Sequence, residues 1–594
     1  MVKNKELKNL ETDFSFDKNK PLNEYPRPML KRDSFLNLNG IWDFKFLDNQ
    51  NIFIQYDKKI VVPYAVESIL SDICERVPEG KKLCYRKEFF FPEGFLKDKT
   101  ILNFGAVDAV CDVYFNRNFM YHHVGGYTPF SIDVTRFLRP NRNEIVVVVT
   151  DETSSDYPIG KQKKKNGGIW YTPVSGIWQT VWLESVNFEY IKAIKYTSNI
   201  DTKEINMNFD VSTVSGNLEK EISISYKGKL INKIKTTDDD VTIQLDKLYL
   251  WSPDNPNLYD VEVSMSGDVV TSYFGMRKYE AKDVDGKMRL FLNNKQIYFH
   301  GLLDQGWYHD GLYTPKSYDV YRYELKKVKE LGFNTLRKHI KIEPEIWYYL
   351  CDTMGIVVWQ DFVNVGEYKM FSDSVLPLLN SRKKKYFGKK VPDNVKENFI
   401  YHVEEVIRTL YNYPSIALWT IFNEGWGEFD LKKTTKMVKE LDDTRFIDSA
   451  SGWFYRDDEN DFDSHHIYFK KLNFDKKPLK ATLSHNKPLI ISEFGGYSLK
   501  IPNHVYDDNK EFGYKKFDNL DEFNKAFLDL YENEIIANID KGISGSIYTQ
   551  LTDVEEEING IMTYDRKVCK LNKDLAMDIS NRLRPNTKKE KNNG

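Results

Sequence analysis

The chain has 594 residues, more than one hydrophobic core normally organises, so its length predicts two to four domains. Its 85 Lys and Arg residues nearly balance its 88 Asp and Glu residues, and the formal net charge of −3 excludes a general nucleic-acid-binding protein. Aromatic residues make up 14% of the chain, a share that suits sheet-rich folds and sugar-stacking surfaces.

The N-terminal stretch MVKNKELKNLETDF has no apolar core, so we expect no signal peptide. The longest apolar run of strand type, at 145–149, is far too short to cross a bilayer. The five cysteines are scattered and contain no CxxC pair, which is typical of free thiols in a reducing compartment. These features predict a soluble, cytoplasmic protein with no membrane partner.

Residues 1–185 alternate short apolar stretches with turns and show almost no helical periodicity. The candidate strands are IWDFKF (41–46), YRKEFFF (85–91), DVYFN (112–116), NEIVVVVT (143–150) and QTVWLE (179–184). This pattern predicts a β-sandwich. The alternation continues over 186–282, where the length predicts a second, smaller sandwich of immunoglobulin type.

From 283 to 585 strand-like stretches alternate with amphipathic helical ones, as in βα architectures. The candidate strands are QIYFHGLL (296–303), FNTLRKH (333–339), IVVWQDF (356–362), IALWTIFNE (416–424), FIDSASGW (446–453), DSHHIYF (463–469), PLIISEF (488–494) and GSIYTQL (545–551). The candidate helices are 317–332, 397–411, 431–441 and 522–539. Eight such strands predict a (β/α)₈ barrel, followed by a disordered tail at 586–594.

Two of the eight predicted barrel strands end in a carboxylate. Glu424 ends the fourth strand and Glu493 ends the seventh, so both are expected at the catalytic face of the barrel and opposite each other. Two opposed carboxylates are the minimum equipment for hydrolysing a glycosidic bond, one as acid and the other as nucleophile. The alternative for each is a structural ion pair. Gly495 and Gly496 follow Glu493, and we expect them to leave room for a sugar.

YNYPSIALWTIFNE and SEFGG, together with SGIWQTVWLE, WSPDNPNLYDV and FGMRK, resemble segments of glycoside hydrolase family 2, and the resemblance covers nearly the whole chain. It implies a jelly-roll sugar-binding domain at 1–185, an immunoglobulin-like domain at 186–282 and a catalytic (β/α)₈ barrel at 283–585. It also implies a retaining exo-β-glycosidase with Glu424 as acid/base, Asn423 on the sugar 2-hydroxyl and Glu493 as nucleophile.

The resemblance extends to the sugar. YTQLTDVEEEINGIMTYDRK resembles a β-galactosidase-like branch of the family. Glucuronidases carry an Asn-x-Lys triplet that binds the sugar carboxylate, and here that triplet falls on Glu557-Ile558-Asn559. A carboxylate at this place repels another carboxylate, so a neutral sugar is expected. β-Mannosidase, pentosidase and β-glucuronidase activity remain as alternatives, and a catalytically inactive carbohydrate-binding protein is the alternative from a different class.

Further residues are expected to contact the substrate glycoside. The resemblance implies that Tyr468 hydrogen-bonds the nucleophile, although a packed aromatic is the plainer alternative. Polar and aromatic side chains near the ends of predicted strands and loops supply the rest. These candidates are Asp304, His339, Asp361, Trp170, Trp426, Trp453, Tyr548 and Glu557.

No metal site is predicted. His465 and His466 have no matching ligand spacing elsewhere, so we interpret them as core or sugar-contact residues. Glu555–Glu557 are interpreted as a solvated acidic loop with one functional member. The β-galactosidase branch often uses Mg²⁺ beside its acid, so a divalent cation remains open with no ligands identified. Self-association also remains open, since dimers and tetramers are common in the family.

Overall fold

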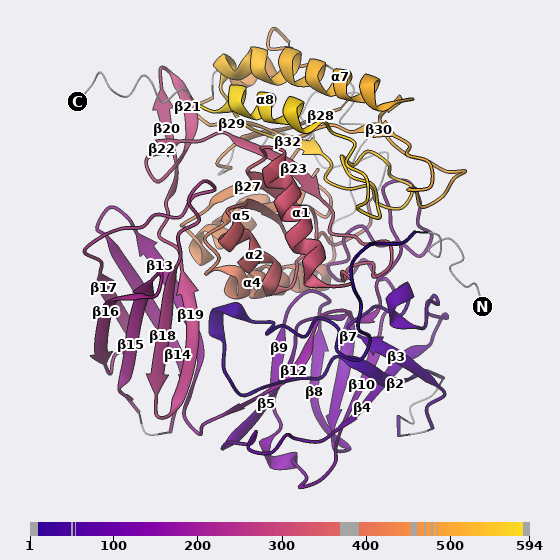
Figure 1. Ribbon diagram of the computed structural model, residues 1–594, viewed down its shortest axis with the longest axis vertical. Coiled ribbons are helices and arrows are strands. Elements are labelled where there is room, and N and C mark those ends of the chain that lie inside the picture. The colour runs from indigo at the N-terminus through magenta and orange to yellow at the C-terminus, as the bar shows by residue number, and fades with distance from the viewer. Residues whose placement is uncertain are drawn as a thin grey trace.

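The computed structural model describes residues 10–48, 52–53, 55–214, 216–368, 391–452, 460–468, 471–476, 479–483 and 485–585. Two β-sandwiches lie beside a barrel that occupies the middle of the molecule (Figure 1). This architecture confirms the predicted fold class. The tail predicted at 586–594 lies outside the described residues.

The first sandwich consists of a four-stranded and a six-stranded antiparallel sheet with an apolar core between them. The four-stranded sheet contains β1 (Phe35–Asn37), β12 (Val181–Val186), β5 (Lys99–Phe104) and β9 (Phe130–Asp133). The six-stranded sheet contains β3 (Lys58–Val62), β2 (Gly40–Leu47), β4 (Lys82–Phe89), β10 (Asn143–Thr150), β7 (Val110–Phe115) and β8 (Asn118–Val124). A short pair, β6 (Val107–Asp108) and β11 (Gly176–Ile177), completes it.

The second sandwich has a three-stranded sheet packed on a four-stranded one, again around its own apolar core. The first sheet contains β13 (Tyr190–Asn199), β14 (Glu204–Ser212) and β17 (Asp240–Gln244). The second contains β16 (Lys229–Thr236), β15 (Lys220–Tyr226), β18 (Tyr259–Met265) and β19 (Asp268–Phe274). A small sheet of β20 (Tyr279–Val284), β21 (Lys287–Leu292) and β22 (Lys295–Gln296) spans the boundary predicted at 282/283, and the domain limits stay predictions.

The barrel sheet has eight parallel strands, one for each strand predicted from the sequence. In chain order they are β23 (Phe299–Asp304), β24 (Thr335–Lys338), β25 (Val357–Asp361), β26 (Ile416–Asn423), β27 (Phe446–Ser451), β28 (Asp463–Ile467), β29 (Leu489–Gly495) and β32 (Ile543–Thr549). The sheet order is β27-β26-β25-β24-β23-β32-β29-β28, so β27 and β28 are its ends. The Asp461 amide bonds the Ile447 carbonyl at 3.0 Å across that seam, which brings the barrel near closure.

Helices cover the outside of the barrel (Figure 1). They are α1 (Tyr318–Glu330), α2 (Glu345–Met354), α4 (Asp393–Leu410), α5 (Leu431–Leu441), α6 (Leu479–Thr482), α7 (Leu520–Leu530) and α8 (Lys573–Leu583). Near α7 the short strands β30 (Tyr497–Leu499) and β31 (Lys515–Phe517) pair. The helix predicted to run to 539 changes to a π turn after Leu530, and α2 and α8 were not predicted. Within the described residues, no helix combines the length and hydropathy that crossing a bilayer requires.

Candidate active site

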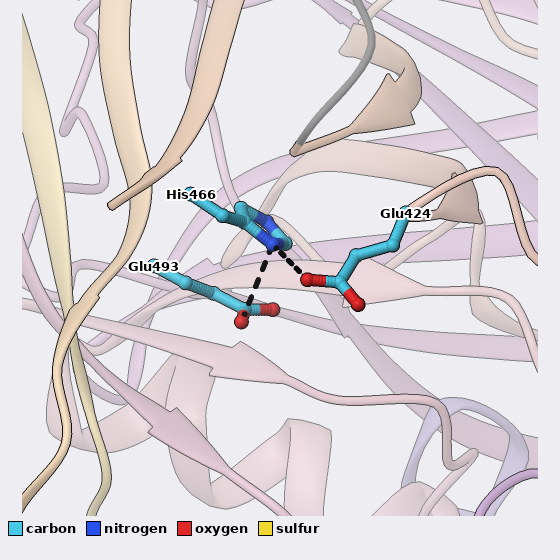
Figure 2. A group of neighbouring side chains, drawn as sticks. All are labelled: Glu424, His466 and Glu493. Carbon is cyan, nitrogen blue, oxygen red and sulfur yellow. Dashed lines mark hydrogen bonds and ion pairs between the residues drawn. The ribbon is translucent and has the colours of Figure 1, made fainter. Parts of the chain in front are cut away.

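The two carboxylates at the strand ends meet at the mouth of the barrel. Glu424 follows β26, the fourth barrel strand, and Glu493 lies near the end of β29, the seventh. Figure 2 shows both side chains pointing toward the ring of His466, which comes from β28. One oxygen of each carboxylate lies within 4.8 Å of the other. This short separation is close to the ~5–5.5 Å of retaining glycosidases and well below the ~6.5–9.5 Å of inverting ones.

Glu424 leaves its strand through a strained backbone conformation. Its φ is +53°, in the left-handed region that non-glycine residues seldom adopt, and Gly425 after it has φ +72°. The Glu424 amide donates to the Ser451 carbonyl at 2.8 Å, which ties the turn to β27. The turn directs the side chain into the barrel mouth instead of along the strand.

Arg337, near the end of β24, is fully buried and bonds to residues of both carboxylate strands. Its guanidinium donates to Asp361 at 3.0 Å, to Glu493 Oε1 at 3.1 Å and to Asn423 Oδ1 at 2.8 Å. Burial alone would lower the pKa of Arg337, but Asp361 and Glu493 beside it raise that pKa. Sequence reasoning missed this residue, although a charge at the end of the apolar stretch FNTLR was the same signal that identified Glu424.

His466 bridges the two carboxylates. Its Nδ1 lies 2.8 Å from Glu424 Oε1 and 3.4 Å from Glu493 Oε2 (Figure 2), and its Nε2 lies 3.2 Å from Arg337 Nη1. Burial lowers the pKa of His466 to about 3, so the ring is neutral near pH 7. A guanidinium can only donate, so Nε2 accepts and Nδ1 carries the proton. The Nδ1–H therefore donates toward both carboxylates.

The tautomer of His466 also bears on metal binding. Among the described residues, one group of three or more His, Cys, Asp or Glu side chains has its ligand atoms close enough together to share an ion. This group consists of Glu424, His466 and Glu493. Metal ligation through Nδ1 needs a lone pair there, and it would leave an N–H at Nε2 facing the Arg337 donor. As arranged, the cluster does not fit a metal site.

Tyr468, which follows β28, donates from its hydroxyl to Glu493 Oε2 at 2.5 Å and lies 3.0 Å from Thr549 Oγ1. Its ring stacks on Tyr514 with 4.2 Å between centroids. Burial, followed by the charge of Glu493, raises the pKa of Tyr468 well above its ordinary value, so it remains a donor. Glu493 is thus held by a hydroxyl on one oxygen and a guanidinium on the other.

The two glycines after Glu493 make room for protein rings and not, as predicted, for a sugar. A Cβ on Gly495 would lie 2.3 Å from Tyr548 Cε2, and one on Gly496 would lie 2.2 Å from Tyr514 Cδ2. Both glycines also have positive φ angles. They let the chain turn tightly between the tyrosines that support the site.

A pocket open to solvent lies over the carboxylates. Six of the predicted substrate-binding residues line it with Glu424 and Glu493, namely Trp170, His339, Asn423, Trp426, Tyr468 and Glu557. The lining residues that sequence reasoning did not propose are Lys161, Ile169, Leu303, Gln305, Ile340, Tyr368, Tyr514 and Thr549. Trp453 lies outside the described residues.

Asp304 and Tyr548 were each predicted one residue away from the position that faces the pocket. Successive residues of a strand face opposite sides, so Gln305 and Thr549 line the pocket instead. Asp304 binds the Lys338 ammonium at 2.6 Å, and Tyr548 is fully buried with its hydroxyl accepting from the Tyr497 amide. Neither reaches the pocket.

Asp361, predicted to contact the sugar, also lies behind the pocket wall and is not among the lining residues. Its carboxylate binds Arg337 and, at 2.8 Å, His339 Nδ1. Burial, followed by the charge of Lys161, lowers the pKa of His339 to about 3, which leaves its Nε2 as an acceptor.

Because Asn423 Oδ1 accepts from Arg337, the amide nitrogen of Asn423 is the group left for a ligand.

The acidic loop Glu555–Glu557 is fixed by hydrogen bonds and is not the solvated loop predicted from the sequence. Glu555 accepts from the Thr172 amide at 2.8 Å, and Glu556 accepts from the Gly168 amide at 3.0 Å. Glu557 accepts from the Tyr171 hydroxyl. All three donors lie on a loop of the first sandwich, so the carboxylates fasten that loop over the barrel mouth.

The same loop of the first sandwich brings an aromatic side chain to the pocket. The Trp170 ring lies edge-on to Tyr368 at 5.1 Å and to Trp426 at 5.4 Å between centroids. The Lys163 ammonium lies 3.8 Å from the Trp170 ring centre, within the range of a cation–π contact. The sandwich therefore supplies part of the pocket wall.

Comparison with known proteins assigns all three regions to one family. The sugar-binding domain model of glycosyl hydrolases family 2 matches residues 47–186, the family's middle model matches 189–277 and its TIM-barrel model matches 284–574. The β-galactosidase of Thermoanaerobacterium thermosulfurigenes is 27% identical over 78% of this chain, which spans 63% of that protein. A putative β-glucuronidase of Formosa agariphila is 26% identical over 58% of the chain, which spans 40% of it.

Solved structures show the same fold at lower identity. A β-glucuronidase from Ruminococcus gnavus superposes with a TM-score of 0.75 at 18% identity, over 95% of this chain and 99% of that one. A β-glucuronidase from an uncultured Clostridium species gives 0.73 at 19% identity, over 93% and 99%. With family models matched in succession along both sandwiches and the barrel, the chain belongs to glycoside hydrolase family 2.

Proposed function

We propose that the chain is a retaining exo-β-glycosidase that removes a terminal, neutral, β-linked sugar and is most like a β-galactosidase. The observation that carries this proposal is the separation of less than 4.8 Å between oxygens of Glu424 and Glu493 at opposed strand ends. Such a separation leaves no room for a water molecule between an acid and a base, but it suits direct attack by one carboxylate.

In the first step Glu424 donates its proton to the glycosidic oxygen while Glu493 attacks the anomeric carbon. The bond to the leaving group breaks, and an ester forms between the sugar and Glu493. Arg337 and Tyr468 fix the orientation of Glu493 before the reaction, which reduces the reorganisation needed in the transition state. In the second step Glu424 removes a proton from water, which attacks the same carbon and releases the sugar with its original configuration.

His466 matches the movement of charge between these steps. The double-displacement mechanism requires the negative charge on Glu493 before the first step and on Glu424 in the glycosyl-enzyme, and the Nδ1–H points toward both. A shared donor stabilises whichever carboxylate is ionised, without moving itself. The neutral ring and its fixed tautomer make this possible.

His466→Ala is expected to slow hydrolysis of the glycosyl-enzyme by roughly 10- to 100-fold, since hydrogen bonds to charged groups contribute about 1.5–3 kcal/mol. His466→Asn should recover most of the rate, because the Asn amide nitrogen can replace Nδ1 as the donor. Pre-steady-state bursts with a dinitrophenyl glycoside measure the step directly. Equal damage in both variants would assign His466 to packing alone.

β-Glucuronidase is the second candidate. The solved structures compared above carry that name, and Lys161 places an ammonium group at the pocket that could pair with a sugar carboxylate. Glu557 at the same pocket favours a neutral sugar. A catalytically inactive carbohydrate-binding protein would need neither Glu424 nor Glu493, and their close pairing therefore favours an enzyme.

A panel of p-nitrophenyl β-glycosides, including galactoside, glucoside, mannoside, xyloside and glucuronide, tests the proposal. We expect the largest kcat/KM on a neutral glycoside and proton NMR to show the β-anomer of the product first. A preference for the glucuronide would overturn the assignment of a neutral sugar. An α-anomer formed first would overturn the double-displacement mechanism.

A further inference from the structure

A chain of buried amide side chains runs behind the pocket wall and ends at the pocket on both sides. Gln305 Nε2 donates to Gln550 Oε1 at 2.9 Å, and Gln550 Nε2 donates to Asn559 Oδ1 at 2.8 Å. Asn559 Nδ2 then donates to Glu557 Oε1 at 2.9 Å. All four residues are at most 2% exposed, and the two end residues line the pocket.

The carboxylate of Glu557 sets the donor-to-acceptor direction of every hydrogen bond in this row of side chains. Glu557 as a carboxylate can only accept, and its other oxygen already accepts from the Tyr171 hydroxyl. Asn559 must therefore present its NH₂ to Glu557 and its carbonyl to Gln550. Gln550 and then Gln305 are oriented in the same way, because each amide has one donor end and one acceptor end.

These orientations determine which atom of Gln305, at the other end of the hydrogen-bonded row, is left without a partner. Gln305 uses its NH₂ on Gln550, so its carbonyl oxygen is the group left over. That Oε1 is buried and has no hydrogen-bond partner among the described residues. A buried acceptor at a pocket needs a donor from water or from a ligand, because leaving it unpaired is costly.

We propose that Gln305 and Glu557 form an acceptor-only wall that binds hydroxyl groups of the sugar and discriminates against a sugar carboxylate. This inference rests on the proposed glycosidase function and identifies Gln305 as a specificity-determining residue. A hydroxyl can donate to Gln305 Oε1 or to Glu557. A carboxylate has no proton to donate, and it would meet two acceptors instead.

The test uses the best neutral p-nitrophenyl glycoside together with its 3-, 4- and 6-deoxy analogues and its uronide. In the wild-type enzyme, at least one deoxy analogue and the uronide should each lose roughly 10- to 100-fold in kcat/KM, since a buried acceptor is left unpaired. In Gln305→Leu and Glu557→Gln, kcat/KM on these analogues should lie within a few-fold of kcat/KM on the parent glycoside. Gln244→Leu, an exposed site in the second sandwich, is the matched control.

Asn559→Leu tests the amide chain separately, because Asn559 does not line the pocket. This variant should also bring kcat/KM on the deoxy analogues and the uronide closer to that on the parent glycoside, since the amide groups of Gln305 and Gln550 are then free to flip. Gln550→Met serves as the second variant should Asn559→Leu fail to fold. If relative kcat/KM on the analogues is unchanged in all of these variants, the proposed acceptor wall is overturned. A wild-type preference for the uronide would also overturn it. Absence of any β-glycosidase activity would instead overturn the proposed function.

Discussion

Glu493→Ala is expected to lose at least about 10⁵-fold in kcat on every β-glycoside, whatever its leaving group. Removing a nucleophile eliminates the covalent route and leaves only binding and electrostatic assistance. Leaving-group quality cannot compensate, because the attacking atom itself is missing. Steady-state rates with nitrophenyl and dinitrophenyl glycosides measure the loss.

Glu493→Gln is the matched control for this variant, since it keeps the size of the side chain and a carbonyl oxygen near Arg337. Its melting temperature should stay near that of the wild type while its activity is as low as that of Glu493→Ala. Added azide should yield an α-glycosyl azide from Glu493→Ala, because azide then attacks from the face that the carboxylate vacated. Retention of more than about a tenth of wild-type activity by either variant would refute Glu493 as nucleophile.

Glu424→Ala should produce a different failure. Loss of general-acid catalysis is expected to cost roughly 10²–10⁴-fold on glycosides with poor leaving groups and much less on dinitrophenyl glycosides, which leave without a proton. The glycosyl-enzyme then accumulates, because no base activates water. A burst of dinitrophenolate and mass spectrometry of the labelled protein measure this accumulation.

Azide should restore turnover of Glu424→Ala and give a β-glycosyl azide, since the anion attacks the intermediate without needing a base. The two variants thus differ in the anomer of the azide that they form, which assigns the two roles independently. A β-azide from Glu493→Ala and an α-azide from Glu424→Ala would reverse the assignment.

Several features of this protein follow from its sequence alone. Apolar strand stretches alternating with amphipathic helices identified all eight barrel strands, because the two hydrophobic periods differ along the chain. The helices that were not predicted show the limit of that signal. The α2 segment EIWYYLCDTM is short and mostly apolar, so its sequence is hard to distinguish from a buried strand. Carboxylates that end apolar strands, Glu424 and Glu493, could be recognised because burying an unpaired charge is costly.

Tertiary structure alone decided which side chains enter the pocket. Asp304 and Tyr548 were predicted one residue away from Gln305 and Thr549, because a strand's period of two leaves its phase to packing. Partners from distant segments decided the rest. Arg337 fixes the tautomer of the distant His466, and Glu557, through Asn559 and Gln550, fixes the orientation of Gln305 from the other end of the barrel domain in the sequence. Hydrogen-bond direction belongs to the assembled network, so no single stretch of sequence contains it.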